Sequence, residues 1–205
     1  MQNNALKPHY CLCRIRPANV HILIVSLFAF CFIGLFTSHV SHADKLDQAT
    51  VKALYTYKFG KFTQWPDNKL NSSSGHFQYC ILGQNPFSLQ TLNMITGKSV
   101  QGLPLTIAVF GSGLVPDKAL AACHVVFISK SEKHRLSTIL SSLQQAPVLT
   151  VSDISEFSAK GGMVTLINKQ SRLRFQVNQT ALQQANITLS SKIMELADIV
   201  NTGQR

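Results

Sequence analysis

Short apolar runs alternate with amphipathic segments along residues 45–200. Residues 45–62 contain no proline, and their large apolar residues recur at helical spacing: Val51, Leu54, Tyr55, Phe59 and Phe62. This spacing predicts a helix with one apolar face. Trp65 and Pro66 follow, and the residue before a proline avoids helical geometry, so the helix ends by this point. Its aromatic residues are either core or part of an interface, and the inward positions favour core.

The rest of the pattern predicts strands separated by helices. Apolar and β-branched runs at 76–82, 105–110, 125–128, 148–151, 163–167 and 172–177 predict strands. Helical patterns occur at 86–95, 134–144, 179–185 and 191–200, and Asp153 with Glu156 resembles a capping box that begins another helix. This order predicts an α/β fold: a single layered domain with a largely parallel sheet flanked by helices. The last two strands, joined by residues 168–171, form a C-terminal hairpin.

The first 43 residues have the pattern of a secretory signal peptide. Residues 1–19 carry Lys7, Arg14 and Arg16 without an acidic residue, and residues 20–36 form a nearly unbroken apolar run. Ser41 and Ala43 are small residues at the −3 and −1 positions of a cleavage site before Asp44. An uncleaved anchor helix is the alternative, but the run is short for a membrane span of about 20 residues. We therefore expect a signal peptide at 1–43, a domain at 44–205 and a periplasmic location.

Charge and motif content argue against several classes of function. Cleavage leaves 16 Lys and Arg against 9 Asp and Glu, a net charge of +7, but the basic residues are scattered and carry no interleaved aromatics. Nucleic acid is therefore not an expected partner. We find no metal-ligand spacing among the histidines, no nucleophile elbow and no phosphate-binding glycine loop. The expectation is a binding protein without catalytic residues, metal or cofactor.

Two of the five cysteines, Cys80 and Cys123, lie beyond the predicted cleavage site. An even number of cysteines in an oxidising compartment favours one disulfide. Such a bond would close a loop of about 44 residues, which is worth roughly 4 kcal/mol in the chain-entropy model. Two buried free thiols are the alternative.

The strand at 172–177 carries the candidate binding residues. Strand alternation places Arg172, Arg174 and Gln176 on one face and the apolar residues on the other. Two guanidinium groups at this spacing can grip a carboxylate or another anion. The plainer interpretation is an edge strand whose charges prevent aggregation.

Taken in order, the motifs of residues 48–199 closely resemble the YfiR family of bacterial periplasmic proteins. No single motif is specific, and the resemblance rests on the ordered set: VKALYTYKF (51–59), KFTQWP (61–66), CILG (80–83), NPF (85–87), CHVVFI (123–128), PVLTVSD (147–153), GGM (161–163), RLRFQVN (172–178) and SSK (190–192).

The resemblance implies a function that composition does not indicate. YfiR-like proteins repress an inner-membrane diguanylate cyclase by binding its periplasmic sensor part, which lowers cyclic-di-GMP and biofilm formation. An OmpA-type outer-membrane lipoprotein can sequester the repressor. The family also implies a homodimer and a disulfide that matches Cys80 and Cys123, whereas the second disulfide of some members has no counterpart here. Under the same family resemblance, a related membrane sensor is the alternative partner. The alternative function is a periplasmic protein that binds a small anion and feeds another membrane sensor.

Overall fold

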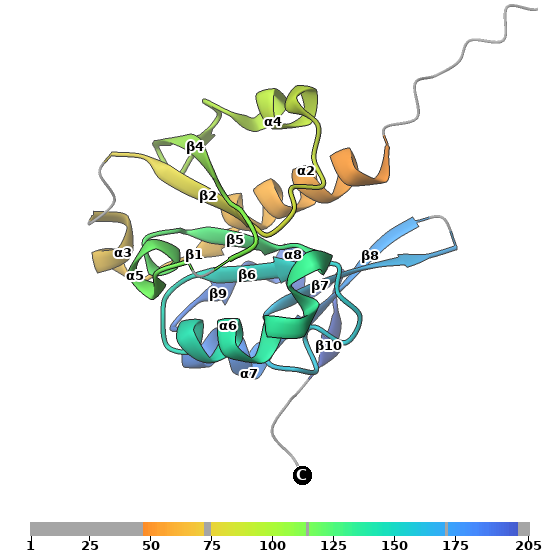
Figure 1. The fold of residues 1–205 in the computed structure, drawn as a ribbon. Helices are drawn as coiled ribbons and strands as arrows, with labels where there is room; N and C mark the ends of the chain where they lie inside the picture. The colour runs from red at the N-terminus through yellow and green to blue at the C-terminus, as the bar shows by residue number, and fades with distance from the viewer. Residues whose placement is uncertain (1–46, 72–74, 114, 171, 201–205) are drawn as a thin grey trace, which may run out of the picture. The chain divides into compact units, whose positions relative to one another are not determined.

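A sheet of eight strands organises the part of the chain that the computed structural model describes, residues 47–71, 75–113, 115–170 and 172–200. The predicted cleavage site at Ala43 and Asp44 lies outside these residues. The strand order is β10-β8-β7-β6-β5-β2-β4-β3 (Figure 1). The strands are β2 (Phe77–Leu82), β3 (Ser99–Val100), β4 (Leu103–Phe110), β5 (Val125–Ile128), β6 (Leu149–Ser152), β7 (Val164–Lys169), β8 (Arg172–Asn178) and β10 (Asp198–Val200). A separate antiparallel pair joins β1 (Thr63–Gln64) to β9 (Thr188–Leu189).

Most neighbouring strands run parallel, which confirms the predicted α/β fold with its largely parallel sheet. The pairs β4–β2, β2–β5, β5–β6, β6–β7 and β8–β10 are parallel, and β3–β4 and β7–β8 are antiparallel. The described helices are α2 (Gln48–Lys61), α3 (Asp67–Asn71), α4 (Leu89–Ile95), α5 (Asp117–Ala121), α6 (Leu136–Leu143), α7 (Gln179–Gln184) and α8 (Ser191–Met194), with a 3₁₀ helix at Lys130–Arg135.

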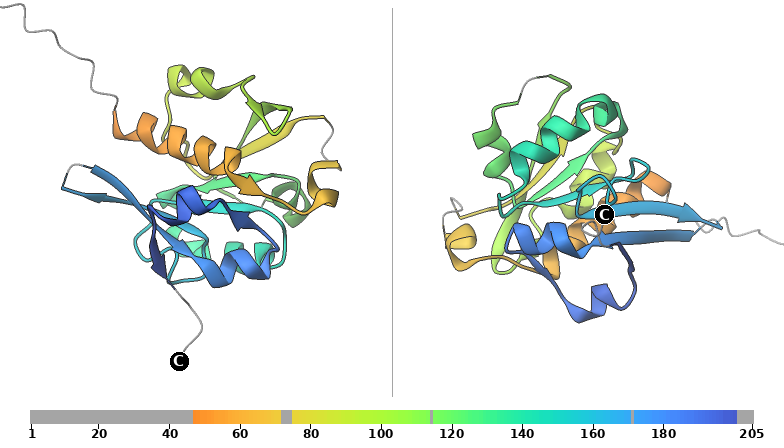
Figure 2. Two further views of the ribbon diagram at one scale, coloured as in Figure 1. Left: turned by 180° about the vertical axis from the view of Figure 1, so that it is seen from behind. Right: turned by 90° about the horizontal axis from the view of Figure 1, so that it is seen from below.

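Helices cover both faces of the central strands, so these strands are apolar throughout. In β2, Tyr79 and Ile81 belong to the core that includes residues of α2, α4 and α7, whereas Cys80 and Leu82 belong to the core under α5 and α6. Figure 2 shows α2 and α6 on different sides of the sheet. A strand buried on both faces needs no polar alternation, which explains the uninterrupted apolar sequence of β5.

Helix α2 contacts the sheet partly through small residues, which the spacing of its large apolar residues did not mark. Its most buried positions include Ala53, Phe59 and Gly60, whereas Leu54 is only half-buried. A Cβ atom at Gly60 would lie 3.1 Å from the ring of Phe77 and from Val125. The glycine therefore allows the helix backbone to approach β2 and β5. Of the predicted apolar face, Phe59 is buried, the residues before it are half-buried, and Phe62 at the end is 42% exposed.

Three details of the predicted secondary structure are wrong. No helix follows Asp153, because its carboxylate pairs with Lys52 at 2.6 Å and Glu156 takes a positive φ of 60°. The segment instead turns so that Phe157 packs against Gly162. Residues 191–200 are helical only in α8, and β10 adds an edge strand to the sheet. The C-terminal hairpin is present, but pairing extends to Lys169 opposite Arg172, so its loop is shorter than the predicted four residues.

Candidate functional site

The outer face of the β7–β8 hairpin carries the predicted binding residues. Arg172 and Arg174 are exposed and point to the same face of β8, as the alternation predicts. Lys169 on β7 lies directly opposite Arg172, and directly opposed residues of an antiparallel pair share a face. Figure 1 shows the outer ends of β7 and β8 extending beyond the other strands of the sheet. Three cationic side chains therefore share an exposed surface, which we call the arginine surface: Lys169, Arg172 and Arg174.

The other face of β8 fixes the position of this surface. Phe175 is buried, and its ring lies against Phe59 of α2 with the centroids 5.0 Å apart. A second edge contact joins Phe175 to Tyr55 at 6.3 Å. Edge-on aromatic pairs of this kind stabilise packing beyond the area that they bury. The arginines are thus presented on a strand whose opposite side is anchored in the core.

A hollow of about 340 Å³ lies on the arginine surface. Arg172 and Arg174 line it together with Leu196, which is 66% exposed, and Asp198. None of the four ion pairs in the described residues involves either arginine. Their guanidinium groups are therefore available to a partner, and Leu196 adds an apolar contact beside them.

Gln176 does not line this hollow. It is half-buried, lies opposite Thr165 of β7 and next to Asp198 of β10. The hydroxyl groups of Thr165 and Ser158 are 2.5 Å apart, so the chain after β6 covers this end of the face. The two arginines therefore lie together at one hollow, whereas Gln176, the third predicted residue, lies at the covered end of the same strand face.

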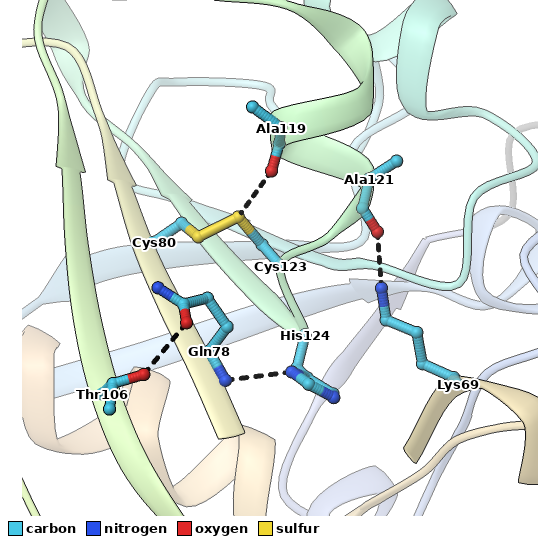
Figure 3. Close-up of a disulfide and its surroundings, with 8 residues drawn as sticks. All are labelled: Lys69, Gln78, Cys80, Thr106, Ala119, Ala121, Cys123 and His124. Carbon is cyan, nitrogen blue, oxygen red and sulfur yellow. Dashed lines mark hydrogen bonds between the residues drawn. A yellow bond between two sulfur atoms is a disulfide. The ribbon is translucent and has the colours of Figure 1, made fainter. Parts of the chain in front are cut away.

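The second feature is the disulfide between Cys80 of β2 and Cys123, which precedes β5 (Figure 3). The two Cα atoms are 6.0 Å apart, and both residues are buried. The pairing expected from the cysteine count is confirmed, and the alternative of two free thiols is wrong. The bond ties the end of α5 to the sheet.

His124, the next residue, is held in an aromatic cluster. Its Nδ1 accepts a hydrogen bond from the backbone N–H of Gln78 at 2.9 Å, and its ring stacks on Phe77 with the centroids 4.6 Å apart. Burial, together with the nearby Lys69 ammonium, lowers the pKa of His124 to about 4. The imidazole is therefore neutral at ordinary pH, with its proton on Nε2, because Nδ1 acts as an acceptor.

Lys69 of α3 is a buried lysine beside this histidine. Its Nζ donates a hydrogen bond to the backbone carbonyl of Ala121, at the end of α5, at 2.5 Å. Burial lowers the pKa of Lys69 to about 8. Figure 3 shows Lys69 reaching from α3 towards Ala121 while Gln78 and His124 lie side by side near the disulfide. A cavity of about 600 Å³, which we call the disulfide cavity, is lined by all of these residues.

Sequence reasoning missed this cluster for identifiable reasons. Lys69 lies in α3, a short helix that the apolar pattern does not mark, and Gln78 and Thr106 are ordinary polar residues of strands. Cys123 and His124 are neighbours in the sequence, but the cysteine forms the disulfide and the histidine ring stacks on Phe77. The only available signal was a polar residue at Gln78 inside an otherwise apolar strand.

Two further findings concern the described residues alone. In the described part of the chain, no group of three His, Cys, Asp or Glu side chains is arranged to hold a metal ion. None of the described helices has the length and apolar character that a membrane span requires.

Comparison with known proteins identifies a family. The model of the YfiR/HmsC-like family matches residues 49–198, which is most of the chain. No curated protein matches. Among solved structures, the chain is similar to a conserved domain protein from Vibrio cholerae O1 biovar El Tor, with 14% identity and a TM-score of 0.45. The similarity covers 60% of this chain and 54% of the other, so it spans about half the length of that protein.

Proposed function

The chain belongs to the YfiR/HmsC-like family, and from this premise we propose that it is a periplasmic regulator that represses an inner-membrane diguanylate cyclase. It binds the periplasmic sensor part of the cyclase, lowers cyclic-di-GMP and so limits biofilm formation. Membership of a family of regulators supports the general role. The disulfide supports an exported location, because such bonds persist in oxidising compartments.

The arginine surface is the observation that carries the proposal. Arg172 and Arg174 are exposed and take part in no ion pair among the described residues. Arginine is favoured at interfaces because its planar fork pairs with two oxygens and still stacks on apolar groups. With Leu196 beside them, the arginines form a surface suited to an acidic segment that also carries an apolar side chain. We place the contact with the sensor here.

Two other associations belong to the same proposal. An OmpA-type outer-membrane lipoprotein would relieve repression by sequestering the regulator, and the regulator would act as a homodimer. Both follow from the family resemblance. They require that the lipoprotein and the cyclase compete for the regulator, so that one cannot bind while the other is bound.

A second candidate function rests on the hollow between the arginines. Its volume is about 340 Å³, and its three cationic residues outnumber the single carboxylate of Asp198, so it suits a small anion, which would then control a membrane sensor. In that case an anion in solution would protect the fold against heat, since a ligand bound only to the folded state stabilises it. Loss of this protection on replacement of the arginines would favour the second function over direct contact with a partner.

Complementation of a gene-deletion strain tests the role of the surface. We expect Arg172→Ala with Arg174→Ala to derepress cyclic-di-GMP synthesis while the protein stays folded and abundant, since exposed substitutions usually change stability by about 0.5 kcal/mol or less. Lys58→Ala with Lys98→Ala is the matched control, because it removes the same charge from exposed positions elsewhere. Normal repression by the arginine variant would show that the arginines serve only as edge charges.

A further inference from the structure

One edge of the eight-stranded sheet is left open along the second half of β4. The outermost strand, β3, pairs only with the first two residues of β4. The backbone of Leu105 is hydrogen-bonded to Lys98 and Gly97, which lie just before β3. From there on, β4 has β2 on one side and no described strand on the other (Figure 1). We call residues 106–110 the open edge.

The open edge presents free backbone hydrogen-bonding groups. Successive residues of a strand direct their N–H and C=O groups to opposite edges. Leu105 directs these groups outward, away from β2, so Ile107 and Val109 do the same. In the part of the chain that the structure describes, the outward groups of these two residues have no hydrogen-bond partner. Each residue therefore offers one donor and one acceptor to a further strand.

The open edge also lacks the features that usually keep a sheet edge from pairing. Exposed edges are commonly protected by charged side chains, by prolines or by bulges. Residues 99–116 contain no charged residue, and residues 105–115 contain no proline. The strands β2 and β4 pair one for one along the open edge, so there is no bulge, and Val109 is 51% exposed. A regular, uncharged edge of this kind pairs readily with another strand.

The opposite edge of the sheet is protected. Its outermost strand, β10, has only three residues and includes Asp198, and the neighbouring β8 carries Arg172 and Arg174. Short edge strands and charged side chains both disfavour pairing with another chain. Protection at one edge and its absence at the other indicate that a strand from outside the chain covers the open edge.

A second copy of this chain suits the open edge. The chain has 19 Lys and Arg against 9 Asp and Glu, so the basic surfaces of two copies repel each other. The open edge lies in an uncharged stretch, and pairing there brings no like charges together. An acidic partner, in contrast, would be attracted to basic surfaces elsewhere and would gain nothing from an edge without positive charge.

The free groups also select one antiparallel register. Residues that exchange two hydrogen bonds lie directly opposite each other. With Ile107 opposite Val109 of the second copy, the two-fold symmetry repeats the pair and gives four hydrogen bonds. A register two residues away would require either Leu105, which is already paired, or Gly111, which lies beyond the strand. The two-fold axis then passes beside Ala108, whose small side chain allows the two strands to approach closely.

We propose that two copies of the protein pair through the open edge in this antiparallel register, so that their sheets join into one continuous sheet. The inference deepens the homodimer of the proposed function, on which it rests, by naming its interface. Such isologous pairing stops at two copies. Because β8 lies towards the other end of the sheet, the arginine surfaces lie at the two far ends of the dimer and stay accessible.

Removal of one outward N–H group tests the interface. Val109→Pro removes a donor that does not bond to β2, and proline is tolerated on an edge strand where the N–H points away from the sheet. Two of the four hydrogen bonds between the copies are lost, so we expect sedimentation equilibrium of the purified oxidised protein to show dimerisation weakened about tenfold or more. Val109→Thr is the matched control, because it keeps the N–H and the branched side chain and should dimerise like the unmodified protein.

Two outcomes of this measurement would overturn the proposal. Normal dimerisation of a folded Val109→Pro protein would place the interface elsewhere. An unmodified protein that stays monomeric up to about 0.1 mM would leave the open edge to an extended segment of another protein. Since the measurement uses the purified protein alone, either outcome leaves the proposed repression of a cyclase untouched.

Engineered cysteines test the register and do not depend on the folding of the proline variant. Directly opposite residues have Cα atoms about 5.5 Å apart, within the range of a disulfide, whereas diagonal neighbours are about 7–8 Å apart. A mixture of Ile107→Cys and Val109→Cys chains should therefore form a disulfide between the two variants, and each variant alone should form far less. Ile107 packs on the other face of the sheet from Cys80, which keeps the new thiols away from the native disulfide. Absence of the mixed disulfide, or equal cross-linking of either variant with itself, would contradict the register.

Amide hydrogen exchange provides a test without substitutions. The N–H groups of Ile107 and Val109 should exchange more slowly as the protein concentration rises through the range in which the dimer forms, because only the dimer pairs them. The N–H of Ala108 points towards β2 and should be protected at every concentration, which makes it an internal control. Exchange at Ile107 and Val109 that does not change with concentration would contradict pairing through the open edge.

Discussion

The ring of Phe175 in β8 lies edge-on against the ring of Phe59 in α2, with the centroids 5.0 Å apart. This contact joins an early helix to a late strand and buries the inner side of β8. The outer side of the same strand carries Arg172 and Arg174. The aromatic pair therefore holds the backbone from which the arginine surface projects.

Removal of this contact should weaken both stability and repression. We expect Phe175→Ala to lower the free energy of unfolding by about 3–5 kcal/mol, because it removes a buried ring and leaves a cavity. Phe62→Ala is the matched control. It also removes a phenylalanine ring, but Phe62 is 42% exposed, so the substitution should lower the free energy of unfolding much less. Urea unfolding of the two purified variants measures the free energy of unfolding of each. Similar losses for the two variants would contradict the anchoring role of Phe175.

The disulfide should make a large contribution to stability. Replacement of both cysteines, Cys80→Ser with Cys123→Ser, removes a link between residues that are 43 apart in the sequence. We expect the free energy of unfolding to fall by about 4 kcal/mol in the chain-entropy model and the periplasmic abundance of the protein to fall with it. The comparison is urea unfolding of the variant against the oxidised protein, with the reduced protein as a second reference. A variant as stable as the oxidised protein would refute this.

His124 should make stability depend on pH. A histidine in the unfolded chain titrates near pH 6.5, whereas burial lowers the pKa of His124 to about 4. Between these values the unfolded state binds a proton that the folded state excludes. Stability should therefore fall as the pH drops from about 6.5 to about 4, by up to about 3 kcal/mol from this group.

His124→Asn separates this effect from other titrating groups. The asparagine side-chain oxygen can still accept the backbone N–H of Gln78 but does not titrate in this range. We expect a flatter dependence of unfolding free energy on pH than in the unmodified protein. Parallel pH profiles for the unmodified protein and His124→Asn would rule out the assignment.

The fold class could be predicted from the local pattern because the central strands have a distinctive apolar sequence. Residues 125–128 are apolar without alternation, which is typical of a strand covered on both faces, and β5 is buried throughout. The strands at the edge of the sheet have less distinctive sequences. The strand β10 has three residues, two of them exposed, and the helical pattern of the preceding residues continues through it.

Features that depend on distant contacts could not be predicted in the same way. Glu156 lies three residues after Asp153, as in a capping box, but the Lys52 ammonium of α2 takes the Asp153 carboxylate. Alternation along β8 placed Arg172 and Arg174 correctly on one exposed face, whereas the half-burial of Gln176 depends on Ser158 and Thr165. The cavity beside the disulfide combines residues from α3, β2, β4 and α5, which no local pattern brings together.

The cellular level of cyclic-di-GMP in a strain that lacks the gene, compared with its parent and with the complemented strain, is the most direct test of the proposed repression. If the protein represses a diguanylate cyclase, the deletion should raise cyclic-di-GMP and biofilm formation, and complementation should return both to the parental level. An unchanged cyclic-di-GMP level in the deletion strain would contradict the link to a cyclase and favour a different membrane sensor.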